Sequence, residues 1–91
     1  MERDEILEAA IARYGEKAQM IIAMEEMAEL TKELSKFLRG SHNEGAIAEE
    51  IADVRIMLDQ LEIMFDCAGA AATYQADKVE RLRKRLEETN G

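Results

Sequence analysis

The sequence predicts an all-α fold, a compact bundle of about four helices, from three observations. The chain of 91 residues contains no proline, the residue that most disrupts helices. Leu, Met, Ala, Glu, Lys and Arg, which favour helices, dominate the composition. Apolar residues nowhere keep the alternation that strands require. At this length we expect a single domain covering residues 1–91.

Glycines divide the chain into four expected helices. These helices are residues 3–13, 16–38, 44–65 and 71–88. The second should end before Arg39-Gly40, because glycine is favoured just after a helix C-terminus. Gly69, in the small-residue stretch CAGAAA, should separate the last two helices. Two long helices joined by a short polar turn are expected to pair antiparallel.

Each long helix carries an apolar stripe that we expect to face the core. On the second helix the stripe is Met20, Ala23, Met24, Met27, Leu30, Leu34 and Phe37. On the third helix it is Ile47, Ile51, Val54, Met57, Leu58, Leu61, Met64 and Phe65.

The charge balance excludes several classes of partner. The net charge is −8, whereas nucleic-acid and anionic-membrane surfaces require basic proteins. No apolar run approaches the roughly 20 residues of a membrane span, and the acidic N-terminus is unlike a secretory signal. The lone Cys67 cannot form an internal disulfide. We therefore expect a cytoplasmic protein that binds neither nucleic acid nor membrane.

Two short motifs crowd carboxylates into the second and third helices. Glu25, Glu26 and Glu29 lie within about one turn, where like charges repel. On the third helix, Glu50 projects into the apolar stripe and Asp53 lies at its margin. A carboxylate on a core face is costly unless it is paired or binds a metal.

Antiparallel pairing would bring these motifs together, because both lie about equally far from the turn near residue 41. Glu26, Glu29, Glu50 and Asp53 would then form a four-carboxylate cluster. Oxygen ligands suit hard cations, so we expect Mg²⁺, with Mn²⁺ as an alternative. Solvated or salt-bridged surface carboxylates remain the other interpretation, above all for Glu29.

The last expected helix carries a basic stripe. Lys78, Arg81 and Arg85 follow Tyr74 at helical spacing and share one face. They could bind phosphate, or they could form ordinary salt bridges near a helix C-terminus. Beside a divalent-metal site, the basic stripe favours hydrolysis of a phosphoanhydride.

The two acidic motifs also carry a resemblance. Glu25-Glu26-x-x-Glu29, followed after twenty residues by Glu50-x-x-Asp53, resembles the signature of the MazG-like, all-α nucleoside triphosphate pyrophosphatases. Lys78 and Arg81 look like the basic element of that family, and the resemblance covers residues 16–86.

The resemblance implies a Mg²⁺-dependent enzyme that cleaves (d)NTPs at the α–β bond to a nucleoside monophosphate and pyrophosphate. It implies metal ligation by residues matching Glu26, Glu29, Glu50 and Asp53, with Glu25 either an accessory catalytic residue or structural. It also implies phosphate contacts from Lys78, Arg81 and Arg85, and assembly into a homodimer or homotetramer.

The role of Gln19, the base preference and the choice between two functions stay open. Gln19 lies on the same face as Glu26 and could meet the sugar or base, or could be an ordinary glutamine at a helix edge. The base preference is not visible in the sequence. The alternative function is a non-catalytic helical module for oligomerisation or nucleotide sensing.

Overall fold

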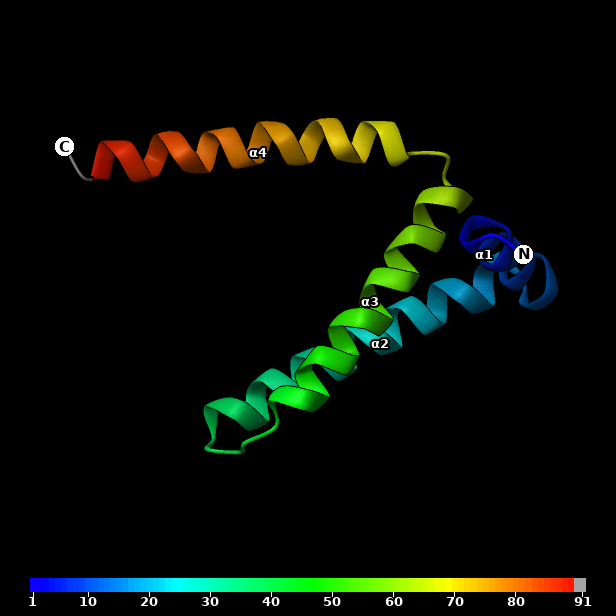
Figure 1. Cartoon of the computed structure of the whole chain (residues 1–91), viewed down its shortest axis with the longest axis horizontal. Coiled ribbons are helices and arrows are strands. Elements are labelled where there is room, and N and C mark those ends of the chain that lie inside the picture. Colours follow the sequence, from blue (N-terminus) through cyan, green and yellow to red (C-terminus); the bar gives the residue numbers. More distant parts are fainter. Residues whose placement is uncertain (90–91) are drawn as a thin grey trace.

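In the computed structural model, the described residues 1–89 form four α-helices and no strand (Figure 1). The helices are α1 (Arg3–Tyr14), α2 (Glu16–Leu38), α3 (Glu44–Met64) and α4 (Ala68–Thr89). The predicted all-α class is therefore confirmed. None of these helices is long and apolar enough to cross a membrane.

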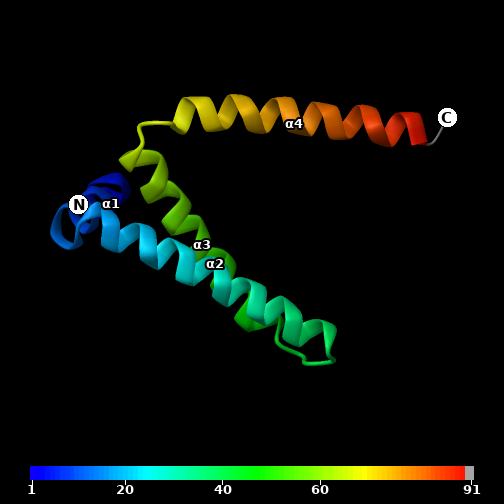
Figure 2. The same cartoon turned by 180° about the vertical axis from the view of Figure 1, so that it is seen from behind.

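The centre of the molecule is the pair formed by α2 and α3. α3 runs back beside α2, and α1 packs against one end of both helices (Figures 1 and 2). The reversal occurs at Gly40, which has a φ of 102°. The Gly40 N–H donates to Phe37 O, and the Ser41 N–H donates to Lys36 O. These bonds satisfy carbonyls at the end of α2, and the positive φ explains why glycine stands at this position.

α4 projects away from the pair, so the expected compact bundle is not found in the single chain. The radius of gyration is 16.6 Å, and the molecule extends 53 × 36 × 23 Å. A compact chain of this length would have a radius of about 12 Å. Among the described residues, α4 contacts only α3 (Figure 2). Most of its surface therefore has no intramolecular partner.

The connector between α3 and α4 differs from the expected break. Gly69 lies inside the first turn of α4, and the chain turns instead at Asp66, which has a φ of 49°. The Asp66 N–H donates to Ile63 O at 3.2 Å, and the Cys67 N–H donates to Glu62 O at 3.0 Å. This is the hydrogen-bond pattern of a helix terminated by a left-handed residue. Asp tolerates that conformation, so glycine was not needed.

Asp66→Gly should stabilise the protein by about 0.5–1 kcal/mol, because glycine adopts a positive φ without the steric cost of a Cβ. The free energy of unfolding from urea titration measures this effect. Glu49→Gly, at an exposed position within α3, is the control and should destabilise by about 0.5–1 kcal/mol. A loss of stability in Asp66→Gly would show that the Asp66 side chain contributes more than the strain costs.

The predicted core stripes face the neighbouring helix only in part. On α2 the buried residues are Gln19, Ala23 and Glu33, whereas Met24 is 59% exposed. On α3 the buried residues are Met57 and Gln60. The helices are rotated so that polar side chains pair across the contact, and each apolar stripe is left partly uncovered. Two helices alone cannot cover apolar faces this wide.

Candidate metal centre

Three carboxylates converge at the contact between α2 and α3. Glu26 comes from α2, and Glu50 and Asp53 come from α3, where a spacing of three places them on one face. One oxygen of each lies within 4.8 Å of the others. Glu26 and Glu50 are half-buried, and Asp53 is the most exposed of the three. The structure thus brings together residues that lie more than twenty positions apart in the sequence.

The electrostatics of this group favour a cation. Burial, together with the neighbouring carboxylates of Glu50 and Asp53, raises the pKa of Glu26 from 4.5 to about 7. Glu50 Oε2 is buried and has no hydrogen-bond partner. Among residues 1–89, no Lys or Arg forms an ion pair with any of the three. Without a cation, the group relieves its repulsion by retaining a proton on Glu26.

The residues fit Mg²⁺ or Mn²⁺ by their chemistry and spacing. Both ions prefer oxygen ligands, and protein Mg²⁺ sites usually combine carboxylates with waters and substrate phosphates. Oxygens on opposite sides of an octahedral Mg²⁺ lie about 4.2 Å apart. The separation of up to 4.8 Å among the three carboxylates is close to that value. Of the carboxylate oxygens in this group, Glu50 Oε2 is the one that is buried without a hydrogen-bond partner.

The other two glutamates of the first motif lie outside this group. Glu29 is about half exposed and forms an ion pair with Lys32 at 3.7 Å. Glu25 is exposed on α2. The sequence predicts four ligands, and the structure brings three of them together.

Gln19 is buried rather than displayed to solvent. Its side chain is 4% exposed, and its Nε2 donates to Gln60 Oε1 at 2.7 Å. Gln19 Oε1 is buried without a partner. In this position Gln19 joins α2 to α3, and no nucleotide could reach it without opening the pair. The sequence analysis missed Gln60, although its polar side chain follows Met57 by three residues on the same face.

Gln60→Leu should destabilise the protein by about 1–3 kcal/mol, because it leaves the Gln19 amide buried without its partner. The double variant Gln19→Leu/Gln60→Leu should recover most of this loss, since both polar groups are removed together. Urea unfolding of the two single variants and the double variant gives the coupling free energy. Additive effects would show that the hydrogen bond contributes nothing specific.

The basic residues form a separate surface on α4. Lys78, Arg81 and Arg85 line a shallow hollow together with Lys84, and all are exposed. Because α4 contacts only α3 within the described chain, the packing does not unite these residues with the carboxylates.

The remaining Arg of this segment, Arg83, forms salt bridges within α4. Its Nε donates to Glu80 Oε2 at 3.0 Å, and it also pairs with Glu87. This pairing raises the pKa of Arg83 and lowers that of Glu80. Arg83, which lies outside the predicted phosphate-binding set, is thus held by two glutamates of its own helix.

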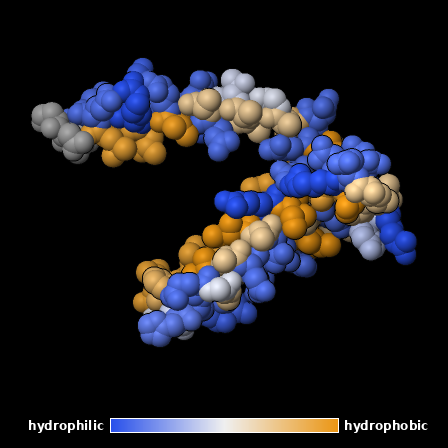
Figure 3. Space-filling view, in the orientation of Figure 1, coloured by the Kyte–Doolittle hydropathy of each residue, from blue (hydrophilic) through white to orange (hydrophobic). Residues whose placement is uncertain are grey.

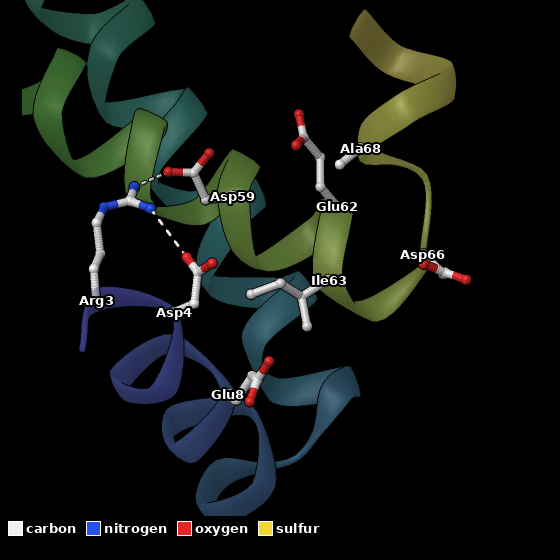
Figure 4. Close-up of a pocket in the computed structure, with 8 residues that line it drawn as sticks. All are labelled: Arg3, Asp4, Glu8, Asp59, Glu62, Ile63, Asp66 and Ala68. Carbon is white, nitrogen blue, oxygen red and sulfur yellow. Dashed lines mark hydrogen bonds and ion pairs between the residues drawn. The ribbon is translucent and has the colours of Figure 1, made fainter. Parts of the chain in front are cut away.

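A second hollow lies where α1 meets α3, and it is mainly acidic (Figure 4). Arg3 pairs there with Asp59 and lies 3.5 Å from Asp4. Glu8, Glu62 and Asp66 complete its charged lining. The Arg3–Asp59 pair connects α1 to α3, so we assign this hollow a structural role.

The chain matches no protein-family model, no curated protein and no solved structure. The description of the site therefore rests on the positions and chemistry of its own residues, without support from a related protein. It is a three-carboxylate group at a helix–helix contact, accompanied by a basic surface on a fourth helix.

Proposed function

We propose that the protein is a Mg²⁺-dependent nucleoside triphosphate pyrophosphohydrolase. It would cleave the α–β phosphoanhydride of (d)NTPs, consuming one water and releasing a nucleoside monophosphate and pyrophosphate. The observation that carries the proposal is the convergence of Glu26, Glu50 and Asp53 at one point of the antiparallel pair α2–α3. The motif resemblance described above supports the same reaction.

In this proposal the three converging carboxylates hold the metal. Glu29 joins them as a fourth ligand when its exposed ion pair with Lys32 opens, which costs little because surface pairs are weak. Glu25, exposed beside Glu26, serves as an accessory carboxylate. When bound, Mg²⁺ would offset the phosphate charge and help to orient the attacking water.

The basic surface of α4 supplies the anion-binding part of the proposal. Arg81 and Arg85 offer planar forks for two phosphate oxygens, and Lys78 adds a point charge. Gln19 takes no direct part, because it is buried against Gln60. A homo-oligomeric state and a cytoplasmic location remain parts of the proposal.

The test is a panel of canonical (d)NTPs incubated with the protein and Mg²⁺, with products separated by anion-exchange chromatography. The expected products are the nucleoside monophosphate and pyrophosphate in equal amounts. Orthophosphate with a nucleoside diphosphate would mean that a different bond is cleaved. Calorimetric titration with Mg²⁺ distinguishes the enzyme from the alternative, a non-catalytic helical module. The absence of Mg²⁺ binding, with or without nucleotide, would favour the non-catalytic module.

A further inference from the structure

Two hydrogen-bonded pairs, the flanking pairs, lie on either side of the carboxylate group along the contact between α2 and α3. The first flanking pair is Gln19 and Gln60, each 4% exposed. Gln19 precedes Glu26 by seven residues, and Gln60 follows Asp53 by seven. Seven residues make about two helical turns, or about 10.5 Å. Because α3 runs back beside α2, equal offsets on both helices place this pair two turns to one side of the carboxylates.

The second flanking pair, Glu33 and Asn43, lies on the other side of the carboxylates. Asn43 Nδ2 donates to Glu33 O at 2.8 Å and to Glu33 Oε1 at 3.2 Å. Glu33 is buried, and its carboxylate also pairs with Lys36. Glu33 follows Glu26 by seven residues, and Asn43 precedes Glu50 by seven. The two flanking pairs therefore bracket the carboxylate group at matching offsets on both helices.

The flanking pairs are not arranged for greatest stability. Gln19 Oε1 and Asn43 Oδ1 are buried without a hydrogen-bond partner, and an unsatisfied buried oxygen is destabilising. Asn43 directly precedes α3, yet its side chain does not cap that helix, although Asn is a favoured N-cap. In paired helices, a buried polar residue can fix the alignment at a cost in stability. The flanking pairs have the placement that such a role requires.

Apolar packing alone does not fix how far α3 is displaced along α2. Among residues 1–89, the buried hydrophobic residues of these two helices are Ala23 and Met57. Figure 3 shows hydrophobic side chains left at the surface of the pair, on the side toward α4. A slip of one turn would move a helix by about 5.4 Å and would break both flanking pairs. It would also separate the three carboxylate oxygens, which now lie within 4.8 Å of one another.

We propose that the flanking pairs are positioning residues, which hold α2 and α3 in the alignment that brings the three carboxylates together. Neither pair contacts the metal or the substrate. The inference rests on the proposed function in one respect, that loss of the alignment weakens Mg²⁺ binding. The alignment itself is a property of the metal-free protein and can be measured without any ligand.

The double variant Gln19→Leu/Gln60→Leu tests the first flanking pair. Its free energy of unfolding should stay near the wild-type value, because both polar groups are removed together. Its affinity for Mg²⁺, measured by calorimetry without nucleotide, should fall about tenfold. A pair with only a structural role would change stability and leave the affinity of the folded protein unaltered. Thr31→Leu/Ala48→Leu is the matched control, since it adds two leucines at exposed positions of the same helices and should leave the affinity within about twofold.

The alignment is measured directly in EDTA by double electron–electron resonance. Nitroxide labels are placed through Lys17→Cys and Glu49→Cys in a Cys67→Ala background, at exposed positions of α2 and α3. The chain with both flanking pairs intact should give one narrow distribution of distances between the labels. Loss of the first flanking pair should add a population displaced by about 5 Å, which corresponds to one helical turn.

Asn43→Ala tests the second flanking pair without removing a side-chain cap from α3. It should also weaken Mg²⁺ binding and broaden the distribution of distances, and wild-type values of both would show that this pair does not position the carboxylates.

An unchanged distribution of distances in Gln19→Leu/Gln60→Leu would overturn the inference, as would a wild-type affinity for Mg²⁺ or an equal loss of affinity in the control. A wild-type chain that binds no Mg²⁺ would overturn the proposed metal centre, and the distances in EDTA would then decide the inference alone.

Discussion

Glu50→Gln is expected to lower the kcat of Mg²⁺-dependent hydrolysis at least about 100-fold. The amide has nearly the shape of the carboxylate, but it cannot supply an anionic oxygen to a cation. The wild-type residue offers a buried Oε2 that no protein group satisfies. The substitution also removes one of three crowded negative charges, so the metal-free variant should be no less stable than the wild type.

Release of pyrophosphate measures this effect, and circular dichroism monitors the helices. Glu49→Gln is the control, because Glu49 is the preceding residue on α3 but is exposed and lies outside the three-carboxylate group. Its kcat should stay within about twofold of the wild-type value. Full activity in Glu50→Gln would remove this residue from the site and would leave the proposed metal centre without the ligand whose Oε2 is buried and unpartnered.

Mg²⁺ binding is expected to strengthen about tenfold between pH 6 and pH 8. The pKa of Glu26 is raised to about 7, so a proton competes with the cation in the lower part of this range. Calorimetry at several pH values should also detect release of a fraction of a proton near pH 7, in proportion to the protonated population of Glu26. Glu49→Gln serves as the control and should retain this pH dependence, because Glu49 is exposed and lies outside the converging group.

The same carboxyl group couples the pH to the stability of the metal-free protein. Because folding raises the pKa of Glu26 from 4.5, the native state binds more protons than the unfolded state between about pH 4.5 and pH 7. The stabilising contribution of Glu26 is complete below this window and is lost as the pH rises through 7. In EDTA, the Tm of the wild type should therefore fall relative to the Tm of Glu26→Gln as the pH rises from 5 to 8. Added Mg²⁺ should reverse the shift, and a pH-independent difference would contradict the assignment.

Local interactions made the helices predictable. The range expected for α2 agrees with the structure at both ends, from Glu16 to Leu38, because Gly15 and Gly40 flank it with positive φ angles. The start of α4 was wrong by three residues. Glycine is the usual terminator, but here Asp66 takes the left-handed conformation and Gly69 lies within the helix. Composition alone does not reveal such a turn.

Periodicity also identified part of the site. It placed Glu50 on the face of α3 that packs against α2, where the carboxylate is half-buried. It could not separate Glu26 from Glu29, three residues apart on one helix, because their difference depends on the rotation of α2 against α3. In the structure Glu26 joins the carboxylate group, whereas Glu29 pairs with Lys32.

The sequence by itself determined the all-helical class, the four helices and the two acidic motifs, since these follow from propensities and spacings within a few turns. Only the tertiary structure decided which face of each helix is buried, that Gln19 bonds to Gln60, and that α4 leaves the pair. Those outcomes depend on helix rotation and on one left-handed residue at Asp66. Contacts between α2 and α3 set the rotation, and backbone hydrogen bonds to the last turn of α3 hold the turn at Asp66. The apolar faces left uncovered show that the folded chain still has surface to bury.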